Sequence, residues 1–156
     1  MAEEFRVALV GCGGVARRYR RIYGRLPGVK VVSAIDLNEA EAAQTAAEVG
    51  AGRISQNFED ALGREIDVVV LSTPNDMHCE QSVEALRAGK HVLLKKPMAR
   101  SVEECDQIVL LGHKHCGPQK GRGEAAGAGR PPAAAAGWQS NSTHTAAGLL
   151  RLPRGR

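Results

Sequence analysis

Short apolar runs alternate with longer amphipathic segments along the first 112 residues of the chain. Runs rich in Val, Ile, Leu and Ala predict strands, and apolar residues that recur every three or four positions predict helices. The predicted strands are residues 5–10, 29–35, 53–54, 67–72 and 91–94. The predicted helices are residues 15–26, 39–49, 76–88 and 101–112, with one helical turn at 58–62.

Strands and helices therefore follow one another in turn, and the central strands are continuous apolar runs. Such runs are typical of parallel strands that helices cover on both faces. The pattern predicts an α/β fold with a doubly wound parallel sheet of the Rossmann type, its five strands in the order 3-2-1-4-5. The strand at 91–94 has the composition of a buried strand, although this order places it at an exposed edge.

Two of the predicted helices begin with capping residues. Asn38 precedes the helix at 39–49, and Glu41 is placed to reach back to it. Ser101 and Glu104 have the spacing of a capping box at the start of the last helix.

The composition of the chain changes at His113. Of the 44 residues from His113 to Arg156, 26 are Gly, Ala, Pro or Arg, and Val, Ile, Phe, Tyr, Met and Asp are all absent. Such a segment has little to bury, so its ordering would cost more entropy than its contacts return. We therefore expect a folded domain over residues 1–112 and a disordered tail over 113–156. GC-rich codons encode the residues of the tail, which suggests the hypothesis of out-of-frame translation.

The net charge of +4 resides in this tail. Residues 1–112 contain 14 Lys and Arg against 16 Asp and Glu, whereas residues 113–156 contain 7 against 1. A mildly acidic main segment does not indicate a nucleic-acid partner. The four cysteines lie far apart and no signal peptide or membrane-length apolar run is present, so we expect a reduced, cytoplasmic protein. The sequence "HKHC" at 113–116 lacks a second ligand cluster, and we predict no metal site.

A glycine-rich turn separates the first strand from the first helix. In "VGCGGVA", Gly11, Gly13 and Ala16 follow the G-x-G-x-x-G/A pattern of dinucleotide-binding loops. Gly11 permits the tight turn, Gly13 lets a diphosphate approach the backbone, and Ala16 lets the helix pack against the strand. The diphosphate would face unpaired N–H groups at the positive end of a helix.

Asp36 ends the second strand, 20 residues after Ala16. A carboxylate there accepts hydrogen bonds from a ribose 2′-hydroxyl and repels a 2′-phosphate, which favours NAD over NADP. The alternative is an ordinary acid near a helix N-terminus. Arg17 and Arg18 on the first helix could contribute charge for a phosphate.

Three landmarks in this order resemble one family. They are "GCGGVA", "STPNDMH" at 72–78 and "AGKHVLLKKPMA" at 88–99, and they resemble the N-terminal domain of the Gfo/Idh/MocA (glucose-fructose oxidoreductase / inositol dehydrogenase) family. The resemblance implies an NAD(P)-dependent oxidoreductase acting on CH–OH groups of sugars, inositols or related polyols. It also implies a C-terminal α/β domain for the substrate, which these 156 residues do not include.

The resemblance assigns site residues along the chain. Lys96 would be the catalytic lysine near the nicotinamide and the substrate hydroxyl, and Lys95 stands where the family has glutamate. Without the family, Pro74, Asn75 and His78 would be read as an ordinary strand-to-helix turn. The residues predicted to bind the cofactor are Gly11, Cys12, Gly13, Gly14, Val15, Ala16, Asp36, Leu37, Thr73, Pro74, Asn75, His78, Lys95, Lys96 and Pro97.

Three functions remain open at this point. The first is a fragment of a sugar or polyol dehydrogenase that binds NAD but is inactive alone. The second is a non-catalytic nucleotide-binding module, and the third is an inert remnant of a frameshifted gene. The predicted partners are a dinucleotide and, in full-length relatives, a small sugar or polyol, with neither nucleic acid nor membrane; the sequence does not indicate an oligomer.

Overall fold

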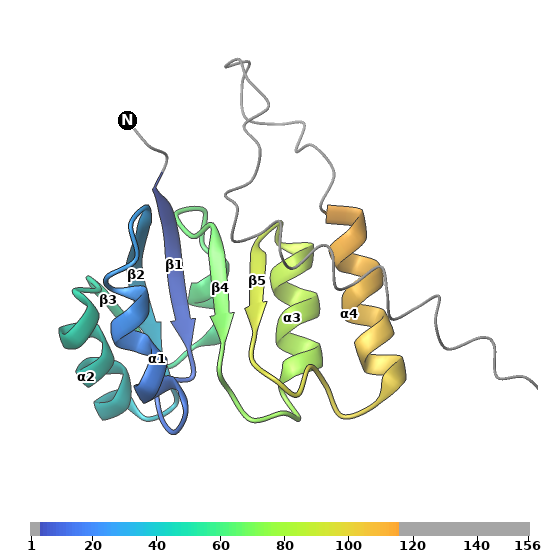
Figure 1. Cartoon of the computed structure of the whole chain (residues 1–156), viewed down its shortest axis with the longest axis horizontal. Helices are drawn as coiled ribbons and strands as arrows, with labels where there is room; N and C mark the ends of the chain where they lie inside the picture. The colour runs from blue at the N-terminus through green and yellow to red at the C-terminus, as the bar shows by residue number, and fades with distance from the viewer. Residues whose placement is uncertain (1–3, 116–156) are drawn as a thin grey trace, which may run out of the picture. The chain divides into compact units, whose positions relative to one another are not determined.

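The computed structural model describes residues 4–115. Strands and helices alternate along these residues (Figure 1). The strands are β1 (Phe5–Val10), β2 (Val29–Ile35), β3 (Arg53–Ser55), β4 (Val68–Leu71) and β5 (His91–Leu94). The helices are α1 (Ala16–Tyr23), α2 (Glu39–Val49), the 3₁₀ helix η1 (Phe58–Leu62), α3 (His78–Arg87) and α4 (Val102–His115).

In this described part the strands form one parallel sheet in the order β3-β2-β1-β4-β5, which confirms the predicted fold class and topology. All the strands run in the same direction, so their carboxyl ends meet at one edge of the sheet (Figure 1). In doubly wound folds this edge is where ligands bind.

Alternate residues of β1 face two different hydrophobic layers. Val7 and Leu9 pack with Tyr23 of α1 and Val49 of α2 on one face of the sheet. The other face carries a cluster of residues from β1, η1, α3 and their neighbours: Ala8, Val10, Ile35, Ala61, Ile66, Val69, Leu71 and Ala85. The central strands of the sheet are therefore covered on both faces, as their apolar runs predicted.

The structure corrects several predicted details of the helices. Helix α1 ends at Tyr23 rather than residue 26, because the chain turns at Gly24, which lies close against Val49. Helix α4 continues through Gly112 to His115, since one glycine inside a helix costs only about 1 kcal/mol.

Side-chain capping also differs in part from the prediction. Asn38 caps α2 through its Oδ1, which accepts from the Ala40 N–H at 3.1 Å. Glu41 does not reach back to Asn38, whose N–H donates to Asp36 Oδ1 at 2.8 Å; Glu41 binds Arg17 of α1 instead. The capping prediction for Glu41 is therefore wrong.

Strand β5 is less buried than its composition predicted. It pairs with β4 and, within residues 4–115, with no other strand, and Leu93 is 46% exposed. The prediction of a buried strand is wrong for this face, whereas the prediction of an exposed edge is confirmed. No helix within residues 4–115 has the length and apolar character needed to cross a bilayer. Cys116 of the "HKHC" cluster and nearly all of the predicted tail lie outside the described residues.

Candidate functional site

The turn after β1 is built around Gly11. Its φ of +82° lies in the region that favours glycine, and its N–H donates to Ile35 O at 2.9 Å. A Cβ at Gly11 would lie 2.7 Å from the backbone of both Ser72 and Thr73. Gly11 thus serves the tight turn, as predicted, and also lets the first loop approach the end of β4.

Three residues of the loop after Cys12 present backbone amides that the rest of the described chain leaves without partners. Within residues 4–115, no hydrogen bond is formed by the N–H groups of Gly13, Gly14 and Val15. They stand before the N-terminus of α1, whose first turn contains no acidic residue. A Cβ at Gly13 would meet no atom within 4 Å, so open space adjoins this loop. Amides and a helix dipole arranged in this way form a site for an anionic group.

Asp36 lies beside this loop at the carboxyl end of β2. Its Oδ2 accepts from the Cys12 N–H at 2.6 Å, and its Oδ1 accepts from the Asn38 N–H at 2.8 Å. The carboxylate is half-buried and each oxygen keeps capacity for a second hydrogen bond. Leu37 follows with 77% of its surface exposed, which offers an apolar contact next to the carboxylate.

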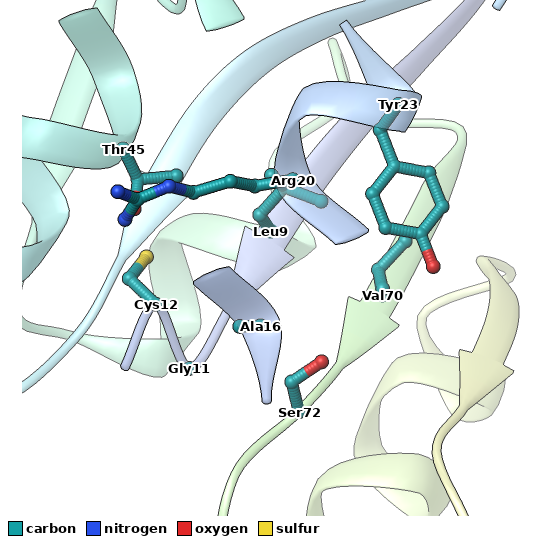
Figure 2. A pocket seen from close by; sticks show the side chains of 9 residues that line it. All are labelled: Leu9, Gly11, Cys12, Ala16, Arg20, Tyr23, Thr45, Val70 and Ser72. Atoms are coloured by element: carbon teal, nitrogen blue, oxygen red, sulfur yellow. The ribbon is translucent and has the colours of Figure 1, made fainter. Parts of the chain in front are cut away.

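A small cavity lies between α1 and the sheet, behind the glycine loop (Figure 2). Arg20 extends across it from α1 toward Thr45 of α2, above the side chain of Cys12 (Figure 2). Arg20 is only 4% exposed, and it donates to Thr45 Oγ1 at 2.8 Å and to Glu48 Oε2 at 2.9 Å. These contacts tie α1 to α2 beneath the loop.

The Cys12 side chain belongs to this interior rather than to the open side of the loop. It is fully buried, and its thiol lies 3.5 Å from Ile35 O. Burial raises the pKa of the Cys12 thiol, and the nearby Asp36 carboxylate raises it further. Because its N–H already binds Asp36, an incoming diphosphate would meet the three amides that follow Cys12.

The segment after β4 supplies the second part of the site. Pro74 and Asn75 are exposed in a turn closed by the Met77 N–H, which donates to Pro74 O at 3.0 Å. His78 begins α3 and is fully buried. Its Nδ1 lies 2.8 Å from Pro97 O and its Nε2 lies 2.9 Å from Thr73 O. His78 therefore joins the turn after β4 to the turn after β5.

The segment after β5 carries the two adjacent lysines. Lys95 is half-buried, with its N–H donating to Leu71 O at 3.1 Å, and Lys96 is exposed. Neither lysine forms an ion pair with any residue between 4 and 115. The Lys96–Pro97 peptide bond is cis.

The predicted cofactor residues therefore lie at a single edge of the sheet, in the segments that follow β1, β2, β4 and β5 (Figure 1). Sequence reasoning missed the contacts between these segments, among them the pairing of Arg17 with Glu41 and the two carbonyl contacts of His78. The opposite charges of Arg17 and Glu41 were visible, but no local pattern indicated that they meet.

The sheet order and the glycine loop define a Rossmann-type nucleotide-binding domain. A match to a family model narrows this class of fold to one family. The chain belongs to the Gfo/Idh/MocA oxidoreductase family, and residues 5–116 match its NAD-binding Rossmann fold. The resemblance carried by the three sequence landmarks is thereby confirmed.

Individual relatives agree with this assignment. The chain is 36% identical over 110 residues to the 1,5-anhydro-D-fructose reductase of Ensifer adhaerens, covering 70% of this chain and 33% of the relative. It is 33% identical over 106 residues to the inositol 2-dehydrogenase 3 of Saccharopolyspora erythraea, covering 67% and 31%. The WlbA dehydrogenase from Bordetella pertussis, solved with NADH and UDP-GlcNAcA, superposes with a TM-score of 0.65 at 30% identity, covering 72% and 33%. The chain thus spans about a third of the length of these relatives.

Proposed function

We propose that this domain binds NAD(H) at the carboxyl edge of its sheet, with the diphosphate on the amides of Gly13, Gly14 and Val15. The observation that carries the proposal is this row of unpartnered amides at the start of α1. A diphosphate would supply the acceptors that the described residues do not provide.

Asp36 supports NAD in preference to NADP. Two backbone N–H groups hold its carboxylate beside the loop, where its remaining lone pairs can accept from the ribose 2′-hydroxyl. A 2′-phosphate would bring negative charge against the same carboxylate. Leu37 would then contact the adenine side of the nucleotide. The nicotinamide would lie toward Thr73, Pro74, Asn75 and the lysine turn.

In the whole protein we propose an oxidoreductase that acts on a sugar, an inositol or a related polyol. The names of the relatives support this substrate class. Lys96 would be the catalytic group, because an exposed ammonium at this edge can orient a substrate hydroxyl and favour the loss of its proton. NAD, when bound, supplies the hydride acceptor.

The domain division is part of the same proposal: a dinucleotide-binding domain over residues 1–112, whose last helix continues to His115, followed by a low-complexity tail. We propose that these 156 residues bind the cofactor without turning over a substrate. Hydride transfer also requires groups that bind the second reactant and exclude water, and the relatives are about three times as long. In the alternative, a non-catalytic nucleotide-binding module, the domain would bind the same dinucleotide, but Lys96 would have no catalytic role.

Calorimetric titration of the full chain with NADH and, separately, with NADPH tests the cofactor proposal. We expect NADH to bind more tightly than NADPH. Asp36→Asn keeps the shape of the side chain but removes its charge, so the affinity ratio of NADPH to NADH should rise by about tenfold, which corresponds to about 1.4 kcal/mol.

The matched control is Asp106→Asn, which makes the same charge change at an exposed position of α4. Its affinity ratio should equal that of the unaltered chain. No binding of either dinucleotide to the unaltered chain would refute the proposed function, and tighter binding of NADPH would refute the preference for NAD.

Lys95→Glu restores the residue type that the family has at this position. Two adjacent ammonium groups repel each other, whereas a glutamate would pair with Lys96 and accept from cofactor hydroxyls. We therefore expect NADH affinity to rise by about threefold to tenfold in the calorimetric titration. An unchanged affinity would show that Lys95 does not impair cofactor binding.

A further inference from the structure

We propose that Glu41 is a second determinant of cofactor choice, because it binds the Arg17 guanidinium that a 2′-phosphate would otherwise bind. The inference rests on the proposed function and deepens it. Asp36 would repel the phosphate, and Glu41 would keep the guanidinium of Arg17 from binding it.

The contact between these two side chains is bidentate. Arg17 Nε donates to Glu41 Oε2 at 3.2 Å, and Arg17 Nη2 donates to Glu41 Oε1. Both carboxylate oxygens are thus engaged by one edge of the planar guanidinium. The same planar fork is what arginine uses to bind phosphate, so a carboxylate in this geometry competes directly with a phosphate.

The ion pair borders the proposed nucleotide site. Arg17 lies in the first turn of α1, two residues after Val15, the last of the unpartnered amides. Glu41 lies in the first turn of α2, three residues after Asn38, whose N–H holds Asp36. Helices α1 and α2 cover the same face of the sheet (Figure 1). Arg17 and Glu41 therefore connect the two helix starts on either side of Asp36.

The local hydrogen bonding explains why Glu41 is available for this role. A glutamate at this position of a helix ordinarily turns back to the N–H of the capping residue. Here Asp36 Oδ1 already accepts from the Asn38 N–H, so that position is taken. Glu41 extends toward α1 instead, and its side chain retains only 17% of its exposure.

Arg18 is exposed on α1 and forms no ion pair with any residue between 4 and 115, so Glu41 does not control its charge. Of the three arginines of α1 that bind an acid, Arg17 is the one best placed for release. Its side chain is 55% exposed, so it can turn toward solvent or a ligand once Glu41 no longer holds it. Arg20 and Arg21 both bind Glu48, in the last turn of α2 and away from Asp36. Removal of the Glu41 charge would therefore free one guanidinium beside the site without disturbing the buried Arg20.

The test compares Glu41→Gln with Glu39→Gln in calorimetric titrations of the full chain with NADH and NADPH. Glu39 is an exposed acid in the same first turn of α2, and no residue among those described binds its side chain. Glu41→Gln should raise the affinity ratio of NADPH to NADH by about fivefold, and Glu39→Gln should leave this ratio near that of the unaltered chain.

Two further measurements separate a released arginine from a general loss of charge. The gain should disappear in the double variant Arg17→Gln/Glu41→Gln, and it should shrink at high salt, since it depends on an exposed cation. An unchanged ratio in Glu41→Gln, an equal rise in Glu39→Gln, or a gain that survives the loss of Arg17 would each overturn the inference. Absence of NADH binding by the unaltered chain would refute the proposed function and this inference with it.

Discussion

Gly11→Ala should destabilise the domain by about 3 kcal/mol and abolish dinucleotide binding, the largest effect expected of any single methyl group here. A side chain at a φ of +82° is strained, and its Cβ would stand 2.7 Å from the backbone of Ser72 and Thr73. These are main-chain atoms that directly follow the central strand β4, so they cannot move aside as a flexible side chain could. Urea unfolding followed by circular dichroism measures the loss of stability.

Gly13→Ala is the matched control for this experiment. Gly13 has no positive φ, and an added Cβ would meet nothing within 4 Å, so stability should change by less than about 0.5 kcal/mol. The new methyl group would project into the space proposed for the diphosphate, and NADH binding should weaken. Equal destabilisation by both substitutions would contradict the close approach at Gly11. Undiminished NADH binding by Gly13→Ala would count against the proposed diphosphate site.

Arg20→Met is expected to destabilise the domain by about 2 kcal/mol, although it replaces a charged residue with an apolar one of similar length. Arg20 is 4% exposed and donates to Thr45 Oγ1 and to Glu48. Its removal leaves the hydroxyl of the fully buried Thr45 without this donor and breaks the link between α1 and α2. Urea unfolding at neutral pH measures the difference, and Arg21→Met, at a side chain 69% exposed, should change it by less than about 0.5 kcal/mol.

The effect of Arg20→Met should also depend on pH. Hydrogen bonding to Arg20, with a further contribution from Arg21, lowers the pKa of Glu48 from 4.5 to about 2. A carboxyl with a lowered pKa stabilises the folded state above its unfolded pKa, and this contribution is lost as the pH falls toward the folded value. The difference in stability between the original chain and Arg20→Met should therefore shrink between about pH 5 and about pH 2. A difference that stays constant over this range would show that Glu48 does not contribute through its charge.

Much of the fold could be predicted because its signals are local. The bounds of β1, β2 and β5 follow from largely apolar segments that end before Gly11, Asp36 and Lys95. The turn at Gly11 was predictable for the same reason, since the need for a positive φ is a property of one residue. The positions of Asp36 and the lysine turn followed from the rule that parallel strands end at a common edge.

The contacts that the sequence did not predict join residues from separate elements. Glu41 has a suitable local partner in the Asn38 N–H, but the Asp36 carboxylate takes that donor and Glu41 binds Arg17 of another helix instead. His78 likewise has the sequence context of an ordinary helix start, yet its ring meets carbonyl groups from two different turns. Leu93 is exposed because successive side chains of a strand point to opposite faces, and it is Val92 and Leu94 that pack against the hydrophobic cluster.

The pair of hydrogen bonds that Asp36 accepts has a consequence for the thermodynamics of ligand capture. Because it accepts from the N–H groups of Cys12 and Asn38, the Asp36 carboxylate holds the nucleotide-binding loop in place before any nucleotide binds. Little conformational freedom of the loop then remains to be surrendered on association. Replacement of Asp36 should for this reason make nucleotide capture entropically more costly, over and above any change in selectivity.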